Sequence, residues 1–355
     1  MATAPSLARD LKSPDLYPQA LSALPLVVRL VPMSRSRYDS ASFLDDRLLL
    51  PEQQGQWLPW QAVATAIDAT GRDDARFIWH IGHVGSTLLS RMLAGLPRTL
   101  ALREPAPLRL LAQIAIDLET PHAYWTRADF DAIARSLARL WARTYAAGDI
   151  AIVKATSVAC GIASRLLALL PPRPSIAIYT GAETYLATIL GGENSRVEAR
   201  QLAQLRLRQL NAAMGSELPL AGLSEGELVA MSWLSGMANL QNAARTSPRL
   251  WHWLDFDVLL AEPEAMLSLA AHHLGLDAPA DAVRAVATGP VMTRYSKAPE
   301  QYAYGAALRH EVLAAARADH RAEIAQGLAW LERVATRYDI AHILQIPRGK
   351  AAHVS

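Results

Sequence analysis

The chain has 355 residues, of which 51% are apolar and 19% are charged, so it can build a buried core and cannot be wholly disordered. Its 35 basic and 33 acidic side chains leave a formal charge of +2. This near-balance gives no general attraction to DNA, RNA or an anionic membrane, so any anion-binding site must be local.

Cys160 is the single cysteine, so no disulfide can form within the chain, as is typical of a reducing compartment. Without a second cysteine or clustered histidines, no zinc site of standard spacing can be built, and we expect no metal. The first residues lack the apolar core of a signal peptide, and the apolar run Ala23–Val31 is too short to span a bilayer. We therefore expect a cytoplasmic protein without a membrane span, in which Cys160 is a small packed residue.

Residues 1–75 are predicted to form an extension packed on the core, which contains a strand candidate at Leu24–Leu30 and a short helical stretch. From Arg76 onward, short apolar runs alternate with amphipathic stretches. The runs have strand length and are apolar on both faces: Arg76–Ile81, Thr99–Leu102, Ile150–Lys154, Ser175–Tyr179 and Leu250–Phe256. Between them lie helical patterns at Ser86–Leu96, Ala106–Leu118, Ala128–Ala147, Val158–Leu170, Glu183–Leu190, Arg196–Ala213 and Glu227–Ala244.

This alternation of strands and helices predicts parallel βαβ units. The expected fold is an α/β three-layer sandwich with a mainly parallel central sheet and helices on both faces. We place this core at residues 76–290, followed by a C-terminal loop and helix at 291–355.

The stretch RFIWHIGHVGSTLLSRML contains the most informative motif. The strand Phe77–Ile81 runs into a turn with two glycines, then Ser86 and Thr87, then a helix. This order aims free backbone N–H groups at an anion, and the two hydroxyls and the His83 ring add donors. The alternative is an ordinary tight turn in which Ser86 or Thr87 caps the helix.

A nucleoside-triphosphate loop of the type G-x-x-x-x-G-K-[ST] requires lysine where this chain has Ser86. The expected anion therefore needs neither that lysine nor Mg²⁺.

GHVGSTLLSRML resembles the 5′-phosphosulfate-binding loop of sulfotransferases, whose pattern is roughly P-[KR]-S-G-[ST]-[ST]-x-L after a strand. The stretch Leu254–Pro279 is similar to a strand, acidic turn and helix found in many members. LREPAPLRLL, which contains Glu104 and Pro105, is similar to a segment of several bacterial members. The matches extend over about Arg76–Pro279, and the first 75 residues carry none.

The resemblance implies a P-loop-like fold. It also implies transfer of a sulfuryl group from 3′-phosphoadenosine-5′-phosphosulfate (PAPS) to an acceptor hydroxyl or amine, with the loop stabilising the leaving phosphate without a metal. The implied donor-binding residues of the loop are Gly82, His83, Val84, Gly85, Ser86, Thr87 and Leu88.

Two positions depart from the family pattern. His83 stands where the loop usually has Lys or Arg, so its charge depends on pH. Thr180 stands where the 3′-phosphate site has Arg, and Thr188 falls on the Ser of that site. Loss of a charge-assisted bond weakens binding by about 1.5–3 kcal/mol unless another cation replaces it. The replacement candidates are Lys154, Arg196, Arg294 and Lys297, and ordinary structural roles are the alternative for each.

A transferase of this kind needs a base for the acceptor proton, and the candidates are Glu104 and His83, both after predicted strands. Alternatively, Glu104 caps the helix that begins near Pro105. Asp255 and Asp257 are expected to mark a strand end and a cap rather than a metal pair. His272 and His273 are expected on a surface or in packing.

Two other function classes remain open from the sequence. One is a P-loop-type kinase that uses a nucleoside triphosphate. The other is a catalytically silent binding protein that kept the fold but lost the arginine at position 180.

Overall fold

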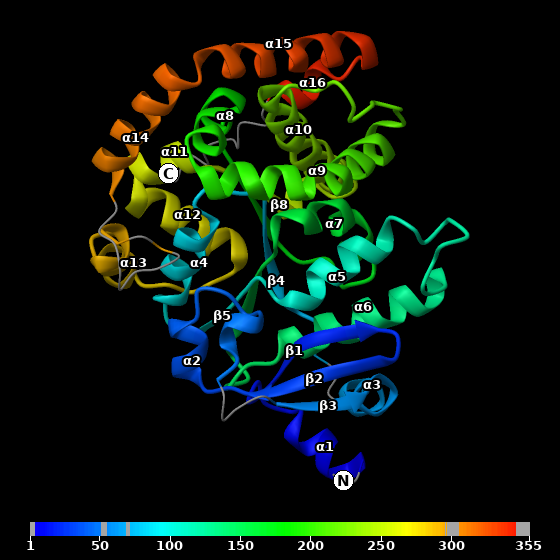
Figure 1. The fold of residues 1–355 in the computed structure, drawn as a ribbon. Helices are drawn as coiled ribbons and strands as arrows, with labels where there is room; N and C mark the ends of the chain where they lie inside the picture. The colour runs from blue at the N-terminus through cyan, green and yellow to red at the C-terminus, as the bar shows by residue number, and fades with distance from the viewer. Residues whose placement is uncertain (1–3, 51–54, 69–71, 295, 297–304, 346–355) are drawn as a thin grey trace.

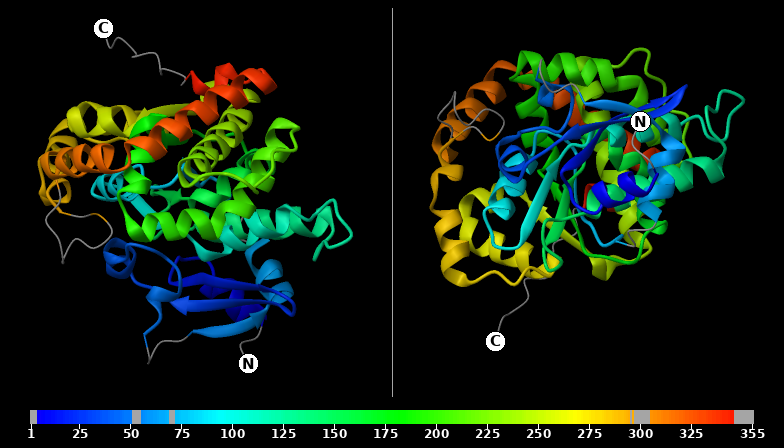
Figure 2. Two further views of the ribbon diagram at one scale, coloured as in Figure 1. Left: turned by 45° about the horizontal axis from the view of Figure 1, so that its top comes forward. Right: turned by 90° about the horizontal axis from the view of Figure 1, so that it is seen from below.

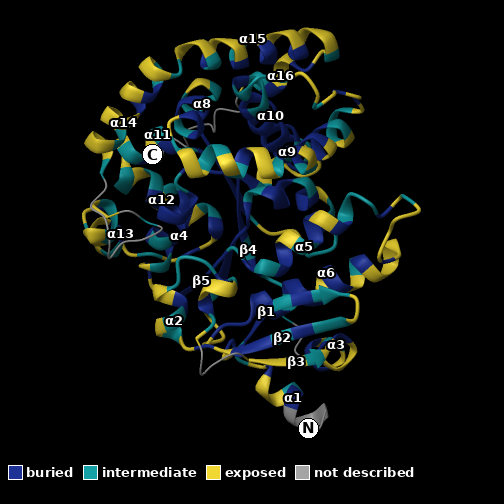
Figure 3. Cartoon of the chain, viewed as in Figure 1, coloured by how far each residue is buried: buried dark blue, intermediate teal, exposed yellow. Residues whose placement is uncertain are grey.

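A computed structural model describes residues 4–50, 55–68, 72–294, 296 and 305–345 of the chain. Within these ranges the strands form a three-stranded antiparallel sheet and a five-stranded parallel sheet (Figure 1). The larger sheet lies at the centre of the molecule, and Figure 3 shows its strands buried beneath partly exposed helices.

The central sheet contains β4 (Arg76–His80), β5 (Thr99–Arg103), β6 (Ile150–Lys154), β7 (Ser175–Tyr179) and β8 (Trp251–Asp255). Their order is β5-β6-β4-β7-β8, and every neighbouring pair is parallel. All five strands predicted from the apolar runs are confirmed. From β4 the chain runs first towards the β5 edge and later returns to β7 on the other side. The carboxyl ends near β4 therefore form the crevice where open α/β sheets bind ligands.

Helices cover both faces of this sheet, as the prediction of a three-layer sandwich requires. Helices α4 (Ser86–Ala94) and α12 (Pro263–Leu274) pack together on one face. The connection from β4 to β5, which contains α4, crosses the sheet in one direction, and all later connections cross it in the opposite direction. Because such connections are right-handed, the helices of the later connections lie on the other face. The helices of these crossovers are α5 (Ala106–Ala115), α6 (Arg127–Ala142), α7 (Ala163–Ala168), α8 (Ala182–Leu190), α9 (Glu193–Met214) and α10 (Glu225–Arg245). The predicted helix Val158–Leu170 is divided into a 3-10 segment, η2 (Ser157–Ile162), and α7.

The N-terminal section packs against the core through its own small sheet (Figure 2, left). This sheet contains β1 (Leu16–Ala23), β2 (Leu26–Pro32) and β3 (Gln56–Pro59), next to helices α1 (Ala4–Asp10), α2 (Arg35–Ser40) and α3 (Trp60–Asp68). The predicted strand Leu24–Leu30 corresponds to β2, which begins two residues later. The sequence prediction missed β1, which pairs with β2 across a turn at Leu24 and Pro25. The apolar run continues through this turn, so composition gave no sign of it.

After β8 the chain forms α11 (Phe256–Ala261), α12, α13 (Ala280–Ala287) and a 3-10 segment, η4 (Pro290–Met292). The C-terminal helices α14 (Ala306–Asp319), α15 (Arg321–Tyr338) and α16 (Ala341–Leu344) then arch over the core (Figure 1, orange to red). Helix α14 packs on α8, and α15 packs on α8 and α10. None of the helices in the described ranges is both long enough and apolar enough to cross a bilayer.

Candidate active site

The loop between β4 and α4 presents a row of unused backbone donors. Gly82, His83 and Gly85 all have positive φ, at 95°, 54° and 68°, so the turn is tightly curled. Gly85 is the N-cap of α4, and no side chain caps the helix there. The described residues provide no acceptor for the amides of residues 84–88, and the positive end of the α4 dipole lies at the same place. The loop therefore has the form of an anion cradle, and the predicted alternative of a side-chain cap is not realised.

The two glycines are required by the geometry of this turn. A Cβ at Gly85 would overlap the ring of Phe256, which begins α11 and packs directly against the loop. Gly82 has a φ value that side chains rarely adopt, and a Cβ there would meet Ser157 at 3.4 Å. The close packing behind the loop fixes the positions of its amides.

His80, the last residue of β4, anchors the start of the loop. The Gly82 amide donates to His80 Nδ1 at 3.1 Å, so the ring hydrogen lies on Nε2, which donates to the Ala155 carbonyl at 2.7 Å. The Cys160 thiol donates to the His80 carbonyl, and burial raises the pKa of Cys160 to about 12. This confirms that Cys160 is a packed residue, and the anion loop is tied to the adjoining end of β6.

The loop opens into a cavity of about 310 Å³ at the carboxyl ends of the strands. Its walls come from the loop itself, the ends of β5 and β6, the start of α9, helix α11, η4 and helix α14. The candidate residues from the sequence that line it are His83, Val84, Gly85, Ser86, Thr87, Leu88, Glu104, Lys154 and Thr188. Thr87 Oγ1 is buried and has no hydrogen-bond partner among the described residues, so a polar ligand in this cavity would satisfy it.

Glu104 and Lys154 form an ion pair on one wall of the cavity. Glu104 follows β5 with φ 54°, and its amide donates to the Lys154 carbonyl at 2.8 Å. Lys154 is fully buried, whereas the Glu104 side chain keeps 17% of its surface exposed. The carboxylate is therefore used by the lysine and does not cap α5, whose N-cap is Pro105.

His83 reaches from the loop to the first turns of α9. Its Nε2 lies 3.2 Å from Glu198 Oε2, and its Nδ1 lies 3.4 Å from Ser195 Oγ. Because a carboxylate only accepts, Nε2 is the donor of this pair. The imidazole thus stays at the cavity with its orientation set by α9.

A chain of polar contacts connects β7 to the C-terminal helices. The Thr180 hydroxyl donates to Asp257 Oδ2 at 2.8 Å, and Arg309 Nη1 donates to Asp257 Oδ1 at 2.6 Å. The Arg309 guanidinium also lies 4.8 Å from the ring centroid of Phe256. Arg309 lines the cavity, and the described residues accept nothing from its Nε and Nη2. Asp257 thus bridges Thr180 at the end of β7 and the Arg309 guanidinium at the cavity.

The other sequence candidates are distributed around this centre. Thr180 is fully buried, and neither Thr180 nor Gly82 lines the cavity. Thr188 lines the cavity, but its hydroxyl donates to the Thr184 carbonyl. Arg294 is exposed at the cavity rim.

The remaining candidates take structural roles or fall outside the description. Arg196 lies 3.7 Å from Glu225, an ion pair on the helix layer. Lys297 lies outside the described residues. Asp255 caps α11 through the Asp257 amide, as expected, and His273 donates to two backbone carbonyls in the packing.

Sequence reasoning missed several residues that shape the site, namely His80, Ser195, Glu198, Phe256 and Arg309. His80 lies two residues before Gly82, and this position was the one available signal. Arg309 is an ordinary arginine of an amphipathic helix, and only the packing of α14 brings it to the cavity. Within the described ranges, no three His, Cys, Asp or Glu side chains gather closely enough to hold a metal ion.

No family model and no curated protein matches the chain. Among solved structures, it is similar to the sulfotransferase domain from the curacin biosynthetic pathway, with 16% identity and a TM-score of 0.40 over 65% of this chain and 84% of that one. It is similar to the sulfotransferase domain of the Synechococcus PCC 7002 olefin synthase, with 17% identity and a TM-score of 0.38 over 73% and 87%. It is also similar to the sulfotransferase STF1 from Mycobacterium tuberculosis H37Rv, with 16% identity and a TM-score of 0.35 over 72% and 82%.

Proposed function

We propose that this protein is a sulfotransferase that moves a sulfuryl group from PAPS to an acceptor hydroxyl or amine. The observation that carries the proposal is the row of unused amides at residues 84–88, which opens into a cavity whose wall holds Glu104. An anion binds such a row through backbone N–H groups and the helix dipole. The unpartnered hydroxyl of Thr87 adds a donor at the same place.

In this proposal the loop binds the 5′-phosphosulfate. The bond between sulfur and the bridging phosphate oxygen breaks, and its electron pair stays on the phosphate of the departing 3′-phosphoadenosine-5′-phosphate (PAP). The acceptor oxygen or nitrogen forms the new bond to sulfur, and its proton passes to the Glu104 carboxylate. The amides of the loop stabilise the charge that develops on the leaving oxygen, and the ring of His83 adds its positive charge when it is protonated. Lys154 acts as a positioning residue, because it holds Glu104 at the end of β5.

Arg309 supplies the cation for the 3′-phosphate in this proposal. The family pattern has an arginine at the position of Thr180, whose hydroxyl here holds Asp257. Asp257 in turn holds Arg309, leaving Nε and Nη2 of the guanidinium for a ligand. A planar guanidinium suits a phosphate because it donates two parallel hydrogen bonds.

Calorimetric titration of the purified chain with PAP tests the proposal. We expect binding, weakened about tenfold or more in a Ser86→Ala/Thr87→Ala variant, since both hydroxyls line the cavity. Ser90→Ala is the matched control, because Ser90 lies on the same helix but not at the cavity.

The same titration with Mg²⁺-ATP separates the other function classes. Binding of ATP in place of PAP would support a kinase. Failure of both ligands would contradict any nucleotide-dependent role and leave the silent binding protein.

A further inference from the structure

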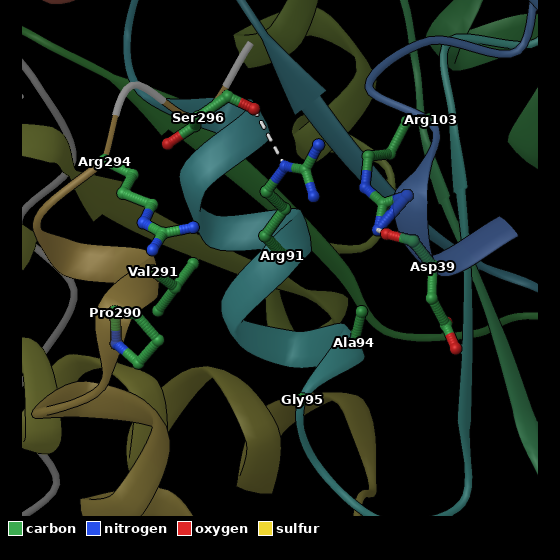
Figure 4. A pocket seen from close by; sticks show the side chains of 9 residues that line it. All are labelled: Asp39, Arg91, Ala94, Gly95, Arg103, Pro290, Val291, Arg294 and Ser296. Atoms are coloured by element: carbon green, nitrogen blue, oxygen red, sulfur yellow. Dashed lines mark hydrogen bonds between the residues drawn. The ribbon is translucent and has the colours of Figure 1, made fainter. Parts of the chain in front are cut away.

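A second pocket adjoins the cavity, with a volume of about 400 Å³ (Figure 4). Three arginines line it: Arg91 from α4, Arg103 from the end of β5, and Arg294 after η4. Figure 4 shows their guanidinium groups in one row, with Arg91 between the other two. Val291, Arg294 and Ser296 line both this pocket and the cavity of the proposed active site, so the two spaces adjoin at these residues.

Arg103 has an unsatisfied donor in this pocket. Only 1% of the residue is exposed, and its two terminal nitrogens donate to the carbonyls of Tyr38, Ala41 and Asp39 at the end of α2. Its Nε is buried and has no partner in the described part of the chain. A buried donor without an acceptor is rare in folded proteins and indicates a missing polar partner.

The charge of the pocket favours an anion. Arg103 and Arg294 form no ion pair with any described carboxylate. The one acidic residue of the lining, Asp39, pairs with Arg35 at 3.2 Å, and Figure 4 shows its carboxylate pointing away from the guanidinium groups. Arg91 donates to the carbonyls of Ser296 and Ser40 and to the Ser42 hydroxyl, which holds its guanidinium at the edge of the pocket.

The shifted pKa of Arg103 also favours an anion in the pocket. Burial, together with the neighbouring charge of Arg91, lowers the pKa of Arg103 to about 10. The buried guanidinium of Arg103 thus carries a charge that its surroundings disfavour, and a bound anion would stabilise it.

The pocket is placed to serve the same reaction as the cavity. Arg103 and Glu104 are consecutive, with Arg103 lining the pocket and Glu104 lining the cavity. On α4, Ser86 lies at the cavity and Arg91 at the pocket, which separates the two sites by only ~7.5 Å along the helix axis at 1.5 Å per residue. One small molecule can therefore occupy the pocket and extend to the proposed base.

We propose that the acceptor carries an oxyanion, either a carboxylate or a phosphate ester, which Arg103 and Arg294 bind in this pocket while its hydroxyl or amine reaches Glu104. This inference rests on the proposed function, and it names the substrate class. The acceptors are small acidic molecules in which about one ring separates the anionic group from the nucleophile. A neutral acceptor of the same shape gives Arg103 and Arg294 no anionic partner, so it binds more weakly than an acidic one.

Three matched probes test the proposal: 4-hydroxybenzoate, 4-hydroxyphenyl phosphate and the neutral 4-hydroxybenzamide. Each is titrated against the full chain with and without saturating PAP. We expect at least one of the two oxyanions to bind tenfold or more tightly than the amide, and their ranking separates a carboxylate from a phosphate site. Binding of the amide as tight as that of both oxyanions, or no binding of either oxyanion, would overturn the proposal.

Arg294→Gln is the decisive variant, because Arg294 is exposed and its replacement leaves the fold intact. We expect it to weaken oxyanion binding about tenfold, in the absence of PAP as well as in its presence. Arg284→Gln is the matched control: Arg284 is an exposed arginine on α13 that pairs with Glu264 away from the pocket. Equal oxyanion affinity in the Arg294 variant and the wild type would contradict the proposal. If PAP fails to bind but Arg294-dependent oxyanion binding remains, the proposed function falls and the anion pocket stands.

Discussion

The ammonium group of Lys154 and the carboxylate of Glu104 form an ion pair across the adjoining ends of β6 and β5. The lysine is completely buried, and the carboxylate of Glu104 compensates its charge. The same carboxylate reaches the cavity in front of the anion loop. One side chain thus serves both the stability of the sheet edge and the proposed chemistry, and the two roles can be separated by mutation.

Replacing Glu104 with Gln removes the carboxylate that pairs with the buried Lys154, and we expect a loss of about 3 kcal/mol in the free energy of unfolding. Loss of the proton acceptor should slow PAP release from PAPS about a hundredfold or more. The double variant Glu104→Gln/Lys154→Met also removes the buried ammonium group of Lys154. Urea unfolding should show its stability restored, while its turnover stays low. Turnover that recovers together with stability would show that Glu104 is structural only.

Gly85→Ala should damage the loop more than the same change at other left-handed glycines. At Gly275, with φ 75°, a Cβ meets nothing within 4 Å, so Gly275→Ala bears only backbone strain of about 1 kcal/mol. At Gly85 the methyl group also collides with Phe256, and we expect a total loss of about 3 kcal/mol. Thermal unfolding of the two variants measures the difference. Similar losses would mean that Phe256 moves aside freely.

Arg309→Gln should weaken binding of PAP about tenfold but leave binding of adenosine 5′-monophosphate unchanged, because only PAP has a 3′-phosphate for the guanidinium. Arg317→Gln is the control on the same helix, since Arg317 pairs with Glu183 and does not line the cavity. Calorimetry with the two nucleotides gives the ratio directly. An equal loss for both would assign Arg309 to the fold rather than to the 3′-phosphate.

His252 and His273 should make stability depend on pH. Burial, and the proximity of His273 at 5.5 Å between ring centroids, lower the pKa of His252 to about 4. The unfolded chain takes up a proton near the ordinary histidine pKa of about 6.5, whereas the folded chain does not. The neutral ring therefore contributes its full stability above pH 6.5 and loses it as the pH falls towards 4, by about 2–3 kcal/mol.

Urea unfolding between pH 7 and pH 4 measures this effect, and a His252→Leu variant should show a shallower decline. His252 Nε2 is buried without a partner among the described residues, so the leucine should cost little at neutral pH. Identical pH profiles for the two proteins would contradict the assignment.

The five strands of the central sheet could be predicted because each is a short run apolar on both faces, the pattern of a strand covered on two sides. The turn after β4 was predictable for a similar reason, since glycines and hydroxyls between a strand and a helix allow few other arrangements. The hairpin of β1 and β2 was not, because the apolar run around Leu24 and Pro25 continues through the turn. Likewise, Lys154 looked like a free cation at a strand end, and only the register of β5 and β6 brings it against Glu104.

Arg309 lies on α14, near the end of the chain, whereas the anion loop lies in its first third. During synthesis on a ribosome, the sheet and the loop therefore emerge long before the helix that completes the cavity. A nascent chain that has already folded its sheet still lacks the guanidinium that Asp257 holds, so the site is completed only after α14 has emerged.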